Sequence, residues 1–262
     1  MDLALDNNVA LISGANRGLG AASARALAAE GASLFLTARD EDLLAALSGE
    51  LRSMGHEVAF QAADLTEPTA AGDVAAAALS HFPRIDILIN CAGSSQGGIF
   101  WDIPDQVWED SLNLKFMGTL RMIRALLPGM REQHYGRIVT VVGNTGKQPG
   151  PRLLPGSTAN AALLALTKGL ADEVAGDGIT INAVNPGPTR TERWTGMMDS
   201  LAAATGSTPA EVEQTFMDKI PTGQLGEPQD IARMIVFLAS KHAGQITGSS
   251  ITADGGATQA LA

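Results

Sequence analysis

The sequence predicts an α/β fold in which a doubly wound, mainly parallel sheet is flanked by helices on both faces. Short apolar runs, many of them β-branched, alternate with alanine- and leucine-rich segments along the whole chain. The runs are continuously apolar, which is typical of strands buried on both faces of a parallel sheet. Because the chain has 262 residues and no low-complexity linker, we expect one domain, residues 1–262.

Each apolar run predicts one strand, and the segments between the runs predict helices. Strands are expected at Val9–Ile12, Leu34–Leu36, Val58–Phe60, Ile85–Ile89, Ile138–Val142, Ile179–Val184 and Ser249–Thr252. Helices are expected at about 18–30, 40–54, 67–81, 104–127, 156–175 and 227–240, with apolar residues at helical spacing. Repeated strand–helix units imply right-handed crossovers between neighbouring parallel strands.

The segment 189–222 follows the sixth predicted strand and carries Trp194, Met197, Met198 and Phe216. Long insertions at the carboxyl ends of strands are where substrate lids occur. We therefore expect a lid over a small, apolar substrate. The alternative is a surface helical hairpin that uses these side chains as its own core.

Composition excludes several classes of partner. The net charge is −10 and no Lys/Arg run is present, which argues against nucleic-acid and anionic-membrane surfaces. No apolar stretch reaches the roughly 20 residues that span a bilayer, and the first residues lack the pattern of a signal peptide. Cys91 is the only cysteine and the four histidines are scattered. We expect a cytoplasmic protein without a metal site.

Gly14, Gly18 and Gly20 form a turn between the first strand and the first helix. Glycine lets the backbone turn tightly and approach a ligand closely, and the N-terminus of the next helix offers free N–H groups with partial positive charge. The pattern predicts a site for the pyrophosphate of a dinucleotide. Taken alone, it is equally typical of a tight turn without a ligand.

The end of the second strand indicates which dinucleotide binds. An acidic residue there would hold the ribose 2′-hydroxyl of NAD, but the chain has Ala38 and then Arg39, with Arg17 in the glycine turn. Two guanidinium groups suit a 2′-phosphate because they form charge-assisted, forked hydrogen bonds. We expect NADP, with NAD as the alternative. Arg39 could instead pair with Asp40 or Glu41.

Together with further motifs, these features make the chain resemble a classical short-chain dehydrogenase/reductase over essentially its whole length. The motifs are Ser13–Gly20, Asp64-Leu65, Asn90-Cys91-Ala92-Gly93, Asn185-Pro186-Gly187, Ile220-Pro221, Gly226-x-Pro228-x-Asp230-Ile231-Ala232 and Ile246-Thr247-Gly248 with Asp254-Gly255-Gly256. The resemblance implies a Rossmann-type sheet in the order 3-2-1-4-5-6-7 and a homotetramer, or a homodimer. It implies cofactor contacts from Ser13, Gly14, Asn16, Arg17, Gly18, Leu19, Gly20, Arg39, Asp64, Leu65, Asn90, Ala92, Gly93, Asn160, Pro186, Gly187, Thr189 and Thr191.

The catalytic positions of that family are only partly matched. The family uses Asn, Ser, Tyr and Lys; Asn113 matches the first, while the other three positions fall on Gly143, Gly156 and Asn160. The spacing from 143 to 156 is that of the family, so these are substitutions and not a slipped register. Tyr135 is the only tyrosine; it precedes the fifth strand, and we expect a structural role for it.

These substitutions remove the family's proton donor, the cation that activates it, and the group that polarises the carbonyl. General acid–base catalysis alone is worth about 10²–10⁴-fold in rate, so we expect poor or undetectable reduction of ordinary ketones. Restoring Gly143→Ser, Gly156→Tyr and Asn160→Lys together is expected to raise it. Groups that could substitute lie in or beside the intervening loop: Asn144, Thr145, Lys147, Arg152, Ser157 and Thr158. Ser157 is expected to be a helix N-cap, and Cys91 to pack.

Three functions follow from this pattern. The first is an NADP(H)-binding oxidoreductase that acts on an unknown carbonyl or alcohol with non-standard catalytic residues. The second is a nucleotide-binding protein without hydride transfer, in a regulatory role. The third is a lyase or isomerase that reuses the same pocket. Fold alone does not decide among them, because function depends on the site.

Overall fold

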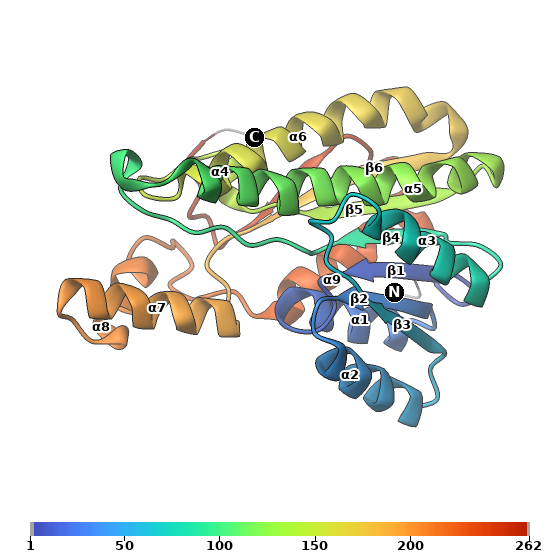
Figure 1. Cartoon of the computed structure of the whole chain (residues 1–262), viewed down its shortest axis with the longest axis horizontal. Coiled ribbons are helices and arrows are strands. Elements are labelled where there is room, and N and C mark those ends of the chain that lie inside the picture. The colour runs from blue at the N-terminus through green and yellow to red at the C-terminus, as the bar shows by residue number, and fades with distance from the viewer. Residues whose placement is uncertain (1–2, 261–262) are drawn as a thin grey trace.

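A seven-stranded parallel sheet forms the centre of the molecule (Figure 1). The computed structural model describes residues 3–260, so the predicted domain's ends, 1–2 and 261–262, lie outside it. The strand order β3-β2-β1-β4-β5-β6-β7 confirms the predicted order. The strands are β1 (Val9–Ser13), β2 (Ser33–Ala38), β3 (Val58–Ala62), β4 (Ile87–Asn90), β5 (Gly136–Val141), β6 (Ile179–Pro186) and β7 (Ser250–Ala253).

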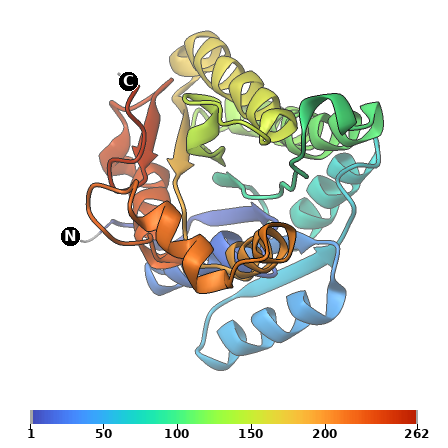
Figure 2. The same ribbon diagram turned by 90° about the vertical axis from the view of Figure 1, so that its left-hand side faces the viewer.

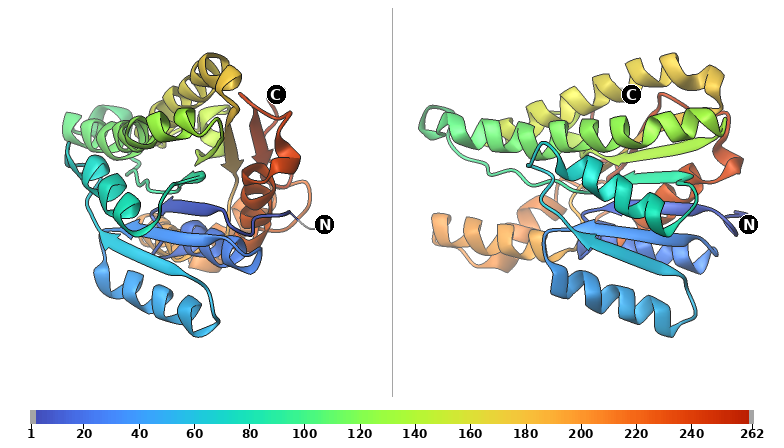
Figure 3. Two further views of the ribbon diagram at one scale, coloured as in Figure 1. Left: turned by 90° about the vertical axis from the view of Figure 1, so that its right-hand side faces the viewer. Right: turned by 45° about the vertical axis from the view of Figure 1, so that its right-hand side comes forward.

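Both faces of the sheet are covered by helices, which is why its strands are mostly apolar (Figures 2 and 3). The helices are α1 (Gly18–Ala29), α2 (Glu41–Ser53), α3 (Ala70–His81), α4 (Asp105–Ser111), α5 (Gly118–Glu132), α6 (Leu154–Val174), α7 (Glu192–Thr205), α8 (Pro209–Met217) and α9 (Pro228–Ala239). Alternate residues of β1 point to opposite faces. Ala10 and Ile12 pack with α1, α2 and α9, whereas Val9 and Leu11 pack with α3, α5 and α6.

The predicted helix 104–127 is interrupted, which corrects the expectation of one continuous helix. Helix α4 gives way to a π-helical turn, η2 (Leu112–Met117), before α5 begins. The structure also carries α5 through Pro128 to Glu132. A π turn inserts an extra residue and rotates the side chains before it relative to those after it. The register of side chains around residue 115 therefore differs from that of a straight helix.

The segment 189–222 forms the hairpin of α7 and α8, which projects beyond the carboxyl ends of the strands (Figure 1). Trp194 and Met198 are buried in a cluster with Ile220 and Leu225. The Trp194 ring also meets the edge of Phe216, with 5.2 Å between ring centroids. These side chains form a cluster shared by the hairpin and the segment that follows α8.

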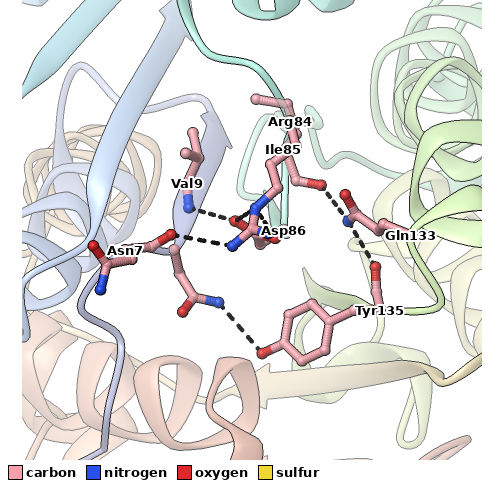
Figure 4. A network of polar contacts seen from close by, with 8 residues as sticks. Asn7, Val9, Arg84, Ile85, Asp86, Gln133 and Tyr135 are labelled. Carbon is pink, nitrogen blue, oxygen red and sulfur yellow. Dashed lines mark hydrogen bonds and ion pairs between the residues drawn. The ribbon is translucent and has the colours of Figure 1, made fainter.

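Tyr135 lies at the amino end of β5, at the opposite end of that strand from Gly143 (Figure 4). Its hydroxyl accepts a hydrogen bond from Asn8 Nδ2 at 3.4 Å, and the guanidinium carbon of Arg137 lies 4.4 Å from its ring centroid. In the same network Asp86 accepts a hydrogen bond from the backbone of Val9. Tyr135 therefore contacts residues at the amino ends of the strands and cannot reach the predicted catalytic positions.

Candidate functional site

The glycine turn between β1 and α1 has no room for side chains. Gly14 has a φ of +65°, and a Cβ on it would lie 2.7 Å from the backbone nitrogen of Ala92. A Cβ on Gly20 would lie 2.1 Å from the carbonyl oxygen of Gly14. The turn is thus pressed against the segment that follows β4. Helix α1 begins beyond it without a side-chain cap or an acidic residue in its first turn, so its N-terminal N–H groups keep their capacity for an anion.

The carboxyl ends of β1, β4 and β5 meet beside this turn. Ser13 and Asn90 are paired in the sheet register, and both are buried. The Ser13 hydroxyl accepts a hydrogen bond from Ala92 N at 3.3 Å, and Asn90 Nδ2 donates to Thr140 Oγ1 at 3.5 Å. Asn90 Oδ1 is buried without a protein partner in the described chain. Parallel strands place these residues at one edge, the usual location of ligands in such sheets.

Arg17, in the turn after β1, and Arg39, directly after the neighbouring strand β2, are both exposed. Arg17 makes a loose ion pair with Glu192, 3.8 Å between Nη1 and Oε2. The alternative partners for Arg39 are not used: Asp40 caps α2 by accepting from Leu43 N, and none of the ion pairs within residues 3–260 includes Arg39.

Asp64 and Leu65, two other residues predicted to contact the cofactor, make contacts within the protein. Asp64 Oδ1 accepts hydrogen bonds from the backbone and the hydroxyl of Thr66, at 3.0 and 2.8 Å. It does not cap a helix, because α3 begins only at Ala70. Leu65 is buried against α5, where a Cβ on Gly118 would approach it to 3.4 Å.

The segment after β6 returns toward the glycine turn. A Cβ on Gly187, which follows Pro186 at the end of β6, would collide with Asp254 at 2.4 Å. Thr189 Oγ1 donates to the Gly187 carbonyl at 2.9 Å. Thr191 caps α7, and its methyl group would lie 3.6 Å from a Cβ on Gly18. The start of the hairpin thus borders the phosphate turn.

The structure brings Gly143, Gly156 and Asn160 together at the end of β5 and the start of α6. A Cβ on Gly143 would lie 3.1 Å from Asn160 Nδ2. A Cβ on Gly156 would lie 3.1 Å from Ser95 and would meet no other residue within 4 Å. Gly143 has a φ of +122°, a conformation that residues with side chains rarely adopt.

Lys115 reaches this cluster from the π turn. Its side chain is 9% exposed. Nζ donates to the Val142 carbonyl at 3.1 Å and makes a short hydrogen bond to Asn160 Oδ1. Asn160 Nδ2 donates to Thr145 Oγ1 at 2.9 Å, which fixes the amide so that its oxygen faces the lysine. The stem of Lys115 passes Gly93, where an added Cβ would lie 3.0 Å from Cε.

The surroundings of Lys115 disfavour its charged form. Burial lowers the pKa of Lys115 from 10.5 to about 7, and the positive charge of Arg193 adds to this effect. Arg193, in the first turn of α7, donates to the Gly93 carbonyl at 3.1 Å and to the Ser95 carbonyl at 3.4 Å. The hairpin is thereby tied to the segment after β4 beside the catalytic positions.

Most of the polar side chains in or beside the loop 144–158 that could substitute are held in hydrogen bonds within the protein. Each polar side chain expected there has a partner, apart from the exposed Arg152. Asn144 donates to Asp254, Lys147 to the Ser250 carbonyl, Ser157 to the Leu153 carbonyl and Thr158 to the Pro155 carbonyl. Ser157 is not the N-cap of α6 either, because that helix already begins at Leu154. Pro155 lies in its first turn, where proline is tolerated.

Asn113 faces away from this cluster. Its Nδ2 donates to the Thr66 carbonyl at 3.1 Å, and its Oδ1 accepts from Arg121 Nη1 at 3.0 Å. The retained asparagine therefore connects the π turn to the loop after β3, and the ionisable side chain at the site is Lys115, two residues later. Cys91 packs against the core around β1 and α1, where burial raises the pKa of its thiol to about 12.

Comparison with known proteins identifies the family. The family model described as enoyl-(acyl carrier protein) reductase matches residues 14–258. The FabG 3-oxoacyl-(acyl-carrier-protein) reductase of Escherichia coli K12 is 31% identical over 251 residues, 96% of this chain and 97% of that protein. The chain belongs to the classical short-chain dehydrogenase/reductase family. This confirms the family and the fold predicted from the sequence.

Other members of the short-chain dehydrogenase/reductase family are similar over nearly their full lengths. A Streptomyces virginiae protein described as a ketoacyl reductase of the monensin polyketide synthase is 37% identical over 252 residues, 95% of this chain and 97% of the relative. The L-sorbose reductase of Gluconobacter frateurii, complexed with NADPH and L-sorbose, has a TM-score of 0.95 at 32% identity, with all of both chains covered. A variant of the actinorhodin polyketide ketoreductase with NADPH has a TM-score of 0.93 at 29% identity over 97% of this chain and 98% of that one.

None of the helices within residues 3–260 combines the length and apolar content that crossing a bilayer requires. No group of three or more His, Cys, Asp or Glu side chains in that range is arranged to hold a metal ion.

Proposed function

We propose that this chain is an NADP(H)-dependent oxidoreductase that interconverts a carbonyl group and an alcohol on a small molecule. The observation that carries the proposal is the uncapped N-terminus of α1 behind a glycine turn, with Arg39 at the end of the neighbouring strand and no acid at Ala38. The similar reductases described with NADPH support the same cofactor.

The residues present fit NADP(H). Gly14, Gly18 and the first turn of α1 offer backbone N–H groups for the pyrophosphate, while Arg17 and Arg39 offer guanidinium groups for the 2′-phosphate. Asn90 Oδ1, buried without a protein partner in the described chain, is an acceptor at the same edge. When bound, NADPH supplies a hydride. The chain's own residues must then hold the substrate, exclude water and supply a proton.

We propose that the substrate is apolar and that it enters the site between the α7–α8 hairpin and the segments that flank Gly156. Trp194 and Met198 are buried within the hairpin and contribute little to this inference. Stronger support comes from Ile99, Phe100 and Leu153, which are exposed. They belong to two segments joined by a 2.8 Å hydrogen bond from Gly98 N to the Arg152 carbonyl.

We further propose a homotetramer in the cytoplasm. β7 is an edge strand of the sheet, and an uncovered edge invites pairing with another copy. We propose that one interface includes β7 and the stretch 247–262, of which residues 261–262 lie outside the described chain. Light scattering of the purified protein at micromolar concentration tests this; a monomer contradicts it.

Nucleotide titration followed by a carbonyl and alcohol panel tests the function. Arg39→Ala is expected to weaken NADPH binding about 10–100-fold, the worth of one charge-assisted hydrogen bond, and to leave NADH binding unchanged. Arg233→Ala, which replaces an exposed side chain of α9 paired with Asp230, serves as the control. Equal loss of affinity for both nucleotides in Arg39→Ala contradicts the phosphate role.

Tight NADPH binding by the wild type without turnover of any panel member would indicate a nucleotide-binding protein instead. Turnover without a change in nicotinamide absorbance would indicate a lyase or isomerase.

A further inference from the structure

The ammonium group of Lys115 has one N–H left over. Lysine has three donors, and the acceptors of Lys115 within residues 3–260 are the Val142 carbonyl and Asn160 Oδ1. Both are neutral, so the chain holds the nitrogen in place without an acidic partner. Burying a cation among neutral groups alone costs desolvation free energy. A purely structural role does not explain that cost, which points to a chemical role for Lys115.

The Lys115 ammonium lies beside two of the family's catalytic positions, the serine position at Gly143 and the lysine position at Asn160. Lys115 contacts Val142 immediately before Gly143, and it contacts Asn160 one helical turn after Gly156. The two glycines carry no side chain there, and a Cβ on Gly156 would already contact Ser95 at 3.1 Å. Gly93, from the motif after β4, packs directly against the aliphatic part of the Lys115 side chain.

We propose that Lys115 is the catalytic proton donor of this chain and acts in place of the family's missing tyrosine. This inference rests on the proposed oxidoreductase function. In the reduction, the carbonyl carbon receives a hydride, with its two electrons, from reduced nicotinamide, which is thereby oxidised. The carbonyl oxygen takes a proton from the Lys115 ammonium. The neutral amine that remains is reprotonated from water, and in the alcohol oxidation each transfer runs in reverse.

The electrostatic surroundings suit this role. The groups in contact with Lys115, from β5, α6 and the segment after β4, are uncharged: the Val142 carbonyl, the Asn160 amide and Gly93. The charge that acts on it comes from Arg193 of α7 and is positive. Burial and this charge lower the pKa of Lys115 to about 7, near the pH at which an acid–base catalyst is most effective.

The first measurement uses the protein without nucleotide. The chain has five lysines, so ¹³Cε-lysine NMR gives a simple spectrum in which Lys115 is assigned by the signal missing from Lys115→Met. We expect its titration midpoint near neutrality, well below the ordinary lysine value of about 10.4. A Lys115 midpoint near that ordinary value overturns the proposal, whatever the activity.

The second measurement compares Lys115→Met and Lys115→Arg with Lys168→Met, in which an exposed lysine paired with Asp172 is replaced. Loss of the donor is expected to lower kcat for carbonyl reduction about 10²–10⁴-fold in both Lys115 variants, with NADPH affinity retained and Lys168→Met unaffected. Wild-type kcat for reduction should fall as pH rises through about 7, and kcat for oxidation should rise.

Arginine separates a proton donor from a fixed charge, because it keeps the charge and does not release the proton. Rescue of kcat by Lys115→Arg, or full kcat in Lys115→Met, overturns the proposal. Absence of NADPH binding in the wild type would instead refute the proposed function, and the titration of Lys115 would then still be decided by NMR.

Discussion

Lys115→Met should remove a pH dependence from the stability of this protein. The pKa of Lys115 is about 7 in the folded chain and 10.5 ordinarily, so between these values the unfolded chain binds the proton and the folded chain does not. Protons therefore favour unfolding, and this group's contribution to stability rises with pH across that window. The whole difference is worth about 5 kcal/mol at about 1.4 kcal/mol per pKa unit. From about pH 6 to about pH 9 it contributes a rise of about 2–3 kcal/mol.

Urea unfolding of the wild type and Lys115→Met at a series of pH values measures this contribution as a difference between two curves. Titration of every other group is common to both proteins and cancels. Lys168→Met, on an exposed face of α6, should follow the wild type. If Lys115→Met shows the same rise in stability with pH as the wild type, the lysine titrates normally, and the inferred effect of its burial is wrong.

Three further outcomes are expected. Adding Gly143→Ser to the protein should lower its stability by about 1–3 kcal/mol, because the backbone at φ +122° excludes ordinary side chains; an unchanged melting temperature contradicts this. Arg193→Ala should raise the Lys115 midpoint in the NMR titration, since it removes a like charge; a lower or unchanged midpoint argues against that coupling. The same substitution removes two hydrogen bonds to the segment after β4, so limited proteolysis should cut the α7–α8 hairpin faster than in the wild type.

The fold was predictable because local signals and topology agree. Continuous apolar runs marked the strands, and alternate β1 residues are buried under helix layers on opposite faces. The glycine turn was recognisable for a similar reason, since Gly14 and Gly20 have no space for a Cβ. Burial on both faces and lack of space for a Cβ restrict which residue types are possible at a position, so both can be recognised in the sequence.

The centre of the site was not predictable in the same way. Lys115 stands among Leu112, Leu114 and Phe116, and a straight helix gives no reason to single it out. One signal was available, a lone lysine within an apolar helical stripe. Its direction depends on the π turn, for which the sequence shows no recognisable motif. The candidates that the sequence offers for a replacement group lie in or beside the loop 144–158, and Lys115 lies outside it.

The contact between Lys115 and Asn160 also limits how this chain could change over evolutionary time. A lysine at 160 would place a second ammonium against the first, in a buried site where like charges oppose each other's ionisation. A cation from α6 and a cation from the π turn therefore disfavour one another, and a lysine at 160 is disfavoured while Lys115 is present.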